Sequence, residues 1–223
     1  MHNIAKQIKK ELKQTNQILS FDKKFLHRNK SIAKTADDNL ELALAMIQSE
    51  SHEYLRGIKL NVQEKNLRVA GSTLRSLLES TANAQWLVED KSGKRASRYI
   101  NSTKGFIDYV NKTGNKQTLT IEKLPKEVTS WTTSSAEDRI NLFSPQAGVV
   151  WDYCSIFTHA SPSYIALQDG LDKVLCYVIS QANTYALTAR LIIKQDSNIY
   201  DTRERKFLDS MANEMLTRLG MIV

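Results

Sequence analysis

Apolar residues recur every three to four positions along most of the chain, and stretches that alternate strictly between apolar and polar residues are missing. This spacing matches the 3.6-residue period of an α-helix and differs from the two-residue period of a β-strand. The broadest apolar face covers residues 171–193 and predicts a helix at the centre of the core. Its apolar positions are Leu171, Val174, Leu175, Val178, Ile179, Ala182, Ala186, Ala189 and Ile193. We therefore expect an all-α fold, a single helical bundle of about seven to nine helices.

The ends of the other helices can be predicted from the same period together with capping residues. Four helices are expected at residues 4–19, 40–58, 62–89 and 96–110. Gly57 is expected to loosen the second of them. Asp201 and Glu204 match a capping box, which predicts a last helix that begins there and ends at Gly220.

The least periodic part of the chain contains all three prolines. Residues 114–134 predict a polar loop, because they lack a repeating apolar position. Ser134 and Glu137 match a second capping box, so we expect a short helix from there to Phe143.

The following helix is expected to begin at Pro145. Ser144 is a favourable N-cap, and proline is well tolerated at the first helical position. The residue before a proline is disfavoured in helical geometry, so the helix should end near Ala160, ahead of Pro162.

All of the net charge lies at the N-terminus. Residues 1–34 carry nine lysines and arginines but two acidic residues, which accounts for the net charge of +7 of the whole chain. We expect residues 1–34 to form a basic helical arm and residues 35–223 to form one helical-bundle domain. Phosphates of RNA or an acidic protein partner would meet the lysines of this arm, Lys6, Lys9, Lys10 and Lys13. The alternative is a solvated amphipathic helix, because no aromatic residues are interleaved with these lysines as a base-stacking surface requires.

Cysteine usage and missing motifs exclude several classes of protein. Cys154 and Cys176 lie in apolar helical patterns without a CxxC motif, which favours free thiols and a reducing, cytoplasmic location. The N-terminus shows no apolar leader, and no segment is long and apolar enough to cross a membrane. His52 and Glu53 lack the second histidine of a zinc site, and glycine-rich nucleotide-binding loops are missing. We therefore expect neither a metal nor another cofactor.

Three polar residues share one face of the helix predicted from Pro145. Asp152, Ser155 and His159 are spaced by three and four positions. A hydrolase triad is one interpretation, but three side chains along one helix cannot readily surround a scissile bond, and no nucleophile elbow accompanies them. The other interpretation is that His159 packs the end of its own helix, where the helix dipole favours the protonated ring.

A second polar group lies on the helix predicted at residues 62–89. Arg75, Glu79 and Asn83 follow one another at intervals of four and therefore form a stripe beside the apolar face. A stripe in this position faces the bundle interior or a cleft. A buried arginine and glutamate must be paired with each other or serve a function.

The order of these motifs resembles the HEPN-like helical-bundle proteins of bacteria, in a branch of largely uncharacterised members. The resemblance covers about residues 35–195 and depends on three motifs. These are R-x-x-x-E-x-x-x-N from Arg75, A-S-R-Y from Ala96 to Tyr99, and Y-x-S-x-x-x-H-x-S from Tyr153 to Ser161. It implies a helical bundle, often a homodimer. In the HEPN superfamily as a whole, many proteins are metal-independent RNA endonucleases of defence and toxin systems, so the resemblance also implies an antitoxin as a candidate partner.

The sequence departs from the nuclease pattern at one point. HEPN nucleases place an arginine a few residues before the histidine on one helix, whereas no arginine lies at residues 152–155. The resemblance therefore implies that Arg75, or Arg98 as second candidate, supplies the guanidinium from another helix. His159 would act as general acid or base and Glu79 would orient the arginine.

The remaining candidates would support this cleft. Asp152 or Ser155 would hold the imidazole, and Asn83 and Tyr153 would line the cleft. The alternative is a non-catalytic HEPN-like interaction or ligand-binding module whose polar cluster is structural.

Overall fold

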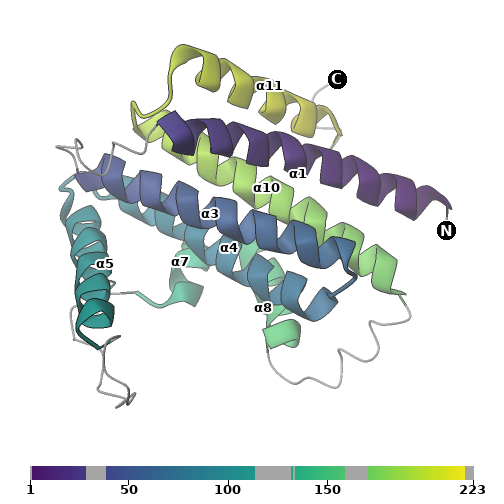
Figure 1. Ribbon diagram of the computed structural model, residues 1–223, viewed down its shortest axis with the longest axis horizontal. Coiled ribbons are helices and arrows are strands. Elements are labelled where there is room, and N and C mark those ends of the chain that lie inside the picture. Colours follow the sequence, from purple (N-terminus) through teal and green to yellow (C-terminus); the bar gives the residue numbers. More distant parts are fainter. Residues whose placement is uncertain (1, 29–38, 114–131, 133, 159–169, 219–223) are drawn as a thin grey trace.

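The computed structural model describes residues 2–28, 39–113, 132, 134–158 and 170–218. Within these residues the chain forms eight helices and no strand, which confirms the predicted all-α bundle (Figure 1). The helices are α1 (His2–Arg28), α3 (Asn39–Gln63), α4 (Leu67–Glu89), α5 (Lys94–Thr113), α7 (Ala136–Phe143), α8 (Pro145–Thr158), α10 (Leu171–Asp196) and α11 (Thr202–Arg218). None of the helices in this described part is long and apolar enough to cross a membrane.

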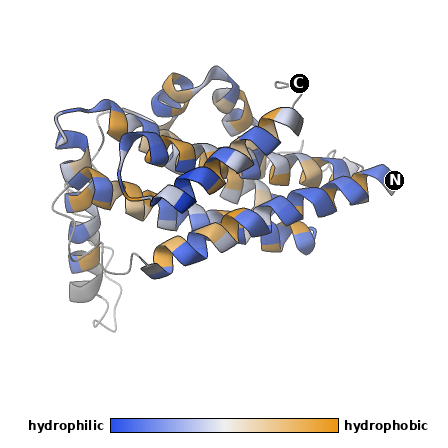
Figure 2. Cartoon of the chain, turned by 90° about the horizontal axis from the view of Figure 1, so that it is seen from above, coloured by the Kyte–Doolittle hydropathy of each residue, from blue (hydrophilic) through white to orange (hydrophobic). Residues whose placement is uncertain are grey.

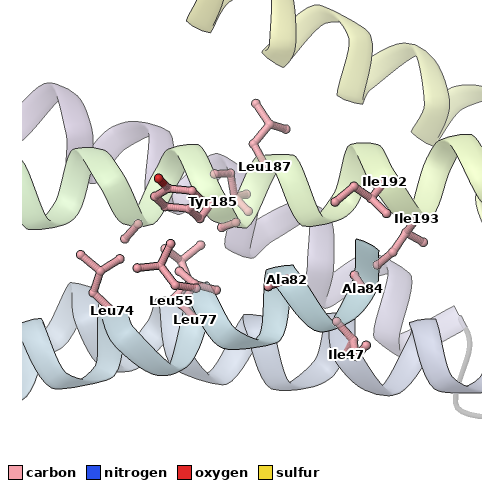
Figure 3. Close-up of a cluster of buried hydrophobic side chains, with 14 of the residues drawn as sticks. Ile47, Leu55, Leu74, Leu77, Ala82, Ala84, Tyr185, Leu187, Ile192 and Ile193 are labelled. Atoms are coloured by element: carbon pink, nitrogen blue, oxygen red, sulfur yellow. The ribbon is translucent and has the colours of Figure 1, made fainter. Parts of the chain in front are cut away.

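Helices α3, α4 and α10 form the centre of the bundle. Their facing side chains interdigitate in one buried cluster, as the predicted apolar faces require (Figure 3). The cluster includes Ile47 and Leu55 of α3, Leu74, Leu77 and Ala82 of α4, and Tyr185 and Ile193 of α10. Each fully buried leucine or isoleucine contributes about 1.5–3 kcal/mol relative to an exposed side chain. Helices α7 and α8 pack on α4 on one side of this centre, and α1 and α11 lie on the other (Figure 1).

The basic N-terminal helix is part of the same core. Most of α1 is hydrophilic, with hydrophobic positions at intervals along it (Figure 2), and its apolar face buries Ile18, Phe21 and Phe25 against the bundle. The amide of Asn183 in α10 donates to the backbone carbonyl and side chain of Glu11, both at 3.0 Å. The lysines occupy the opposite, exposed face. An amphipathic helix of this kind is stabilised by its packing, whatever the lysines bind.

A fully buried ion pair joins α1 to α10. The guanidinium of Arg190 donates through Nε to Asp22 Oδ1 at 2.8 Å and through Nη2 to Asp22 Oδ2. Gln48 and His52 of α3 also contact this carboxylate, at 3.1 and 3.2 Å. Burial alone would raise the pKa of Asp22, but Arg190 and these hydrogen bonds hold it below its ordinary value. This network was not predicted from the sequence.

Two of the predicted helix starts are confirmed. Ser144 accepts a hydrogen bond from the backbone N–H of Ala147 at 3.4 Å and caps α8. Asp201 and Glu204 form the predicted capping box of α11, since each side chain accepts from the backbone N–H of the other at 2.9 Å.

The capping box of α7 lies one residue later than predicted. It consists of Ser135 and Asp138, whose side chains each accept the other's backbone N–H. Ser134 cannot play this part, because its backbone N–H donates to Thr132 Oγ1 at 3.1 Å and its carbonyl accepts from Arg139.

The boundary between the second and third predicted helices also shifts. Helix α3 continues through Gly57 to Gln63, and α4 begins at Leu67. The break falls at Lys65, which has a φ of 55°, and at Asn66, whose side chain caps α4. Local capping therefore places the break, and the glycine does not.

Candidate functional site

Helix α8 approaches α4 closely because of one glycine. A Cβ at Gly71 would lie 2.2 Å from the ring of Phe157, which is far inside van der Waals contact. Phe157 is buried against α4 as a result, together with Cys154 and Ala147 of the same face of α8. This packing fixes the rotation of α8 and determines which of its polar side chains face α4.

Arg75 of α4 lies against the last turns of α8. Its Nη1 donates to Ser155 Oγ and to Thr158 Oγ1, both at 3.3 Å. Its Nε donates to Glu79 Oε1 at 3.3 Å, and its guanidinium stacks on the Trp151 ring, 4.0 Å from the ring centre. Two segments 80 residues apart in the sequence therefore meet at one guanidinium.

Glu79 is bound by both helices as well. The indole Nε1 of Trp151 donates to Glu79 Oε1 at 2.9 Å, the same oxygen that accepts from Arg75. The side chains of Arg75 and Glu79 are 21% and 34% exposed, so an ion pair between them alone would contribute only about 0.3–0.5 kcal/mol. The stacking on Trp151 and the hydroxyl contacts do more to fix the arginine.

Part of this cluster has hydrogen-bonding capacity that the described residues do not use. Within the described residues, Arg75 Nη2 and Glu79 Oε2 take part in no hydrogen bond. A guanidinium whose Nε and Nη1 are fixed still presents its second amino group in a fixed direction. The chemistry of that group suits a phosphate or carboxylate oxygen.

Arg68 is a second arginine of α4 that contacts α8, and it was not predicted from the sequence. Its Nε donates to the backbone carbonyl of Phe157 at 3.4 Å. Arg68 and Arg75 are seven residues apart, two turns of α4, so both project toward the C-terminal end of α8. The negative end of a helix dipole attracts such cations. The spacing from Arg75 was a signal in the sequence that could have indicated it.

Asn83, the third residue of the predicted stripe, binds a different arginine. Arg139 of α7 donates through Nε to Asn83 Oδ1 at 2.8 Å and through Nη1 to Thr132 Oγ1 at 2.8 Å. Burial lowers the pKa of Arg139, and the nearby charges of Glu79 and Asp138 only partly oppose this shift. Asn83 therefore anchors α7 to α4 and stands beside the Arg75 cluster.

The other α8 candidates lie at different places on that helix. Ser155 faces Arg75, as described above, whereas Asp152 is exposed to solvent. Tyr153 packs edge-to-face on Phe157 and on Tyr177 of α10, with ring centres 5.4 and 5.7 Å apart. Tyr153 thus belongs to an aromatic group on the α10 side of α8.

The remaining predicted residues are placed as follows. Arg98 is exposed on α5 and has no hydrogen bond or ion pair with the Arg75 cluster in the described part of the chain. Tyr99 of the A-S-R-Y motif donates to Glu50 of α3 at 2.9 Å. His159 lies outside the described residues, directly after Thr158 in the sequence.

The pKa values of neighbouring groups reflect burial. Burial raises the pKa of Glu50, although the hydrogen bond from Tyr99 opposes this. Burial and the charges of Glu50 and Glu79 raise the pKa of Tyr54. Burial also raises the pKa of Cys154 to about 12, against an opposing effect of Arg75. Cys154 is therefore a neutral thiol at physiological pH and unsuited to nucleophilic attack.

The residues that the structure describes contain no group of three or more histidine, cysteine, aspartate or glutamate side chains arranged to hold a metal ion. Comparison with protein-family models, with curated proteins and with solved structures found no match to this chain.

Proposed function

We propose that this chain is an RNA-directed, HEPN-like protein of the cytoplasm that cleaves RNA without a metal ion, as an effector of a bacterial defence or toxin system. The observation that supports the proposal is the contact of Arg75 with Ser155 and Thr158. It brings the predicted arginine and glutamate stripe to the segment that leads directly into His159. Sequence order alone left these two motifs 80 residues apart.

In this proposal the reaction is an internal transfer at phosphorus. The 2′-hydroxyl of one nucleotide loses its proton to a general base and attacks the adjacent phosphorus, and the 5′-oxygen of the next nucleotide leaves with a proton. His159 exchanges these protons, because imidazole titrates near neutral pH. Arg75 stabilises the charge that develops on the phosphoryl oxygens through Nη2, which has no hydrogen bond to the described residues. Glu79 and Trp151 are positioning residues, since they orient the guanidinium.

A non-catalytic interaction or ligand-binding module is the second candidate. The observation that favours it is that Arg75 already has partners on both helices, Glu79 and Trp151 as well as two hydroxyls. A cluster of this kind joins α4 to α8 even without a substrate. Removing Arg75 would then lower the stability of the fold, and no reaction rate would change because this candidate catalyses no reaction.

The experiment that separates the two candidates is incubation of purified protein with total RNA in EDTA. Wild type is compared with His159→Ala, Arg75→Ala and Arg75→Lys, and melting temperatures are recorded for all variants. Arg56→Ala is the matched control, because Arg56 is 60% exposed on α3 and pairs with Glu53.

If the protein is a nuclease, wild type and Arg56→Ala both cleave RNA. The cleavage rate of each of the other three variants is at least about a hundredfold lower. Loss in Arg75→Lys, at a nearly unchanged melting temperature, would reflect the missing guanidinium fork. Intact RNA with wild type, together with a sharp fall in melting temperature in Arg75→Ala, supports the structural module and removes the nuclease. Arg98→Ala is measured in the same assay. If it loses cleavage while Arg75→Ala keeps it, the role belongs to Arg98.

Two partner expectations belong to this proposal: a homodimer, and an antitoxin or other acidic protein. Light scattering of purified protein tests the first. A measured mass equal to that of one chain at micromolar protein concentration would contradict the homodimer.

A further inference from the structure

A groove of about 690 Å³ is lined by residues of α1 and of the first turns of α11. These two helices lie on the side of the bundle away from α8 (Figure 1). The floor of the groove is apolar. Phe21 of α1 and Phe207 of α11 stack there with ring centres 5.4 Å apart and planes 9° apart. Phe21 is 7% exposed but Phe207 is 36% exposed, so part of the Phe207 ring remains in contact with water.

The walls of this groove carry more positive than negative charge, three cations against two carboxylates. Lys13 and Lys24 of α1 and Arg203 of α11 line it. Asp201 and Glu204 also line it, but both carboxylates accept backbone N–H groups at the start of α11. Their charge therefore faces the helix end, where the dipole already favours it.

The charge continues beyond the groove along α1. Lys6, Lys9 and Lys10 are exposed on the same outer face of the helix as Lys13. A ligand that lies along α1 would thus meet positive charge over several turns, with an apolar contact at Phe207.

We infer that this groove binds an acidic amphipathic helix of a protein partner. The combination of a short apolar floor and basic walls between two neighbouring helices matches helix-in-groove recognition, in which an apolar anchor inserts and charged side chains flank it. Single-stranded RNA fits less well, because successive bases need several exposed rings, whereas Phe207 is the one partly exposed ring among the residues that line the groove. This inference gives a binding site to the acidic protein partner of the proposed function, and it does not depend on the RNA site on α4 and α8.

The probe is a fluorescein-labelled peptide of about 18 residues with leucine at helical spacing and glutamate elsewhere. A scrambled peptide of the same composition and a fluorescein-labelled oligouridine of similar length serve as competing ligands. Fluorescence anisotropy gives each affinity for the full chain and its variants. Lys24→Glu and Phe207→Ala alter the groove, whereas Lys23→Glu changes the same charge on α1 at a position that does not line it.

We expect the amphipathic peptide to bind at least about tenfold more tightly than the scrambled peptide. Lys24→Glu and Phe207→Ala should each reduce its affinity at least about fivefold, and Lys23→Glu less than about twofold. Equal binding of both peptides, no binding, or equal effects of Lys23→Glu and Lys24→Glu would overturn the inference. Tighter binding of oligouridine, unaffected by Phe207→Ala, would overturn it in favour of a nucleic-acid surface. Melting temperatures establish that each variant is folded.

Discussion

The guanidinium of Arg75 on α4 stacks on the indole ring of Trp151 on α8, 4.0 Å from its centre. The same indole donates its N–H to Glu79, the carboxylate that Arg75 also contacts. Trp151 therefore holds both charged groups of the stripe at once. The orientation of Arg75 depends on how α8 packs, as well as on the neighbouring turn of its own helix.

This relationship predicts an energetic coupling between Arg75 and Trp151. A double-mutant cycle of Arg75→Ala and Trp151→Leu, measured by urea unfolding, should give a coupling free energy of about 1 kcal/mol, because stacking is lost in either single variant. Arg56→Ala combined with Trp151→Leu is the control, and its coupling should be near zero. Additive effects in both pairs would show that the stacking does not hold the cluster.

The space around two glycines, Gly71 of α4 and Gly57 of α3, predicts opposite effects of substitution by alanine. Gly71→Ala should lower the free energy of unfolding by about 1–3 kcal/mol, because its Cβ overlaps the buried Phe157 ring. Gly57→Ala should raise it by about 0.5–1 kcal/mol, since its Cβ meets only Thr73 Cγ2 at 3.6 Å and alanine favours the helix. Chemical denaturation measures both. Stabilisation by Gly71→Ala would contradict the packing described.

The buried pair of Asp22 and Arg190 predicts a cost for removing one charge alone. Asp22→Asn should destabilise the fold by about 3–5 kcal/mol, because it leaves Arg190 buried without its carboxylate. The double variant Asp22→Leu, Arg190→Met should cost much less than the sum of the two single changes. Urea unfolding at pH 7 measures these values, and a fully additive double variant would argue against direct pairing.

The same pair predicts how stability depends on pH. The pKa of Asp22 is below its ordinary value of 3.8 in the folded chain. The ionised carboxylate therefore stabilises the fold fully above about pH 5, and this contribution is lost as the pH falls through 3.8 toward the lower folded value. The double variant should lose stability less steeply than wild type between about pH 5 and pH 2. If the stability of wild type and of the double variant falls equally steeply with pH, Asp22 is not paired in solution.

Burial of Cys154 predicts an unreactive thiol. Its pKa of about 12 leaves almost no thiolate at pH 8. In a Cys176→Ala background, the folded protein should react with Ellman's reagent only at the rate at which it unfolds, and immediately in urea. Rapid reaction without denaturant would place Cys154 at the surface.

The sequence predicted the helices well because their apolar period and caps are local properties. The box of Asp201 and Glu204 lies where its spacing indicated. The prediction of Ser134 as the N-cap of α7 was wrong because the backbone N–H of Ser134 donates to Thr132, and capping patterns do not include this contact. Lys65 adopts a positive φ that residue identity does not indicate.

The candidate site was harder to predict because it depends on the rotation of one helix on another. The four-residue interval between Arg75 and Glu79 correctly predicted that the two side chains lie next to each other on α4. Which face of α8 meets them is decided by the insertion of Phe157 at Gly71, and this brings Trp151 and Ser155 to Arg75 while Tyr153 turns toward Tyr177. Arg190 was missed for a related reason, since its partner Asp22 is distant in sequence and lies in a segment that otherwise indicated only a basic surface.

The most direct test of the proposed function is the single-turnover rate of cleavage of a defined RNA in EDTA, with analysis of the product ends. Attack by the 2′-hydroxyl predicts 5′-hydroxyl and 2′,3′-cyclic phosphate ends. It also predicts no cleavage where that nucleotide is 2′-deoxy, and a rate for Arg75→Ala at least about a hundredfold below wild type at a similar melting temperature. Products with 5′-phosphate ends, or an unchanged rate in Arg75→Ala, would contradict the assignment of Arg75 as the group that stabilises the transition state.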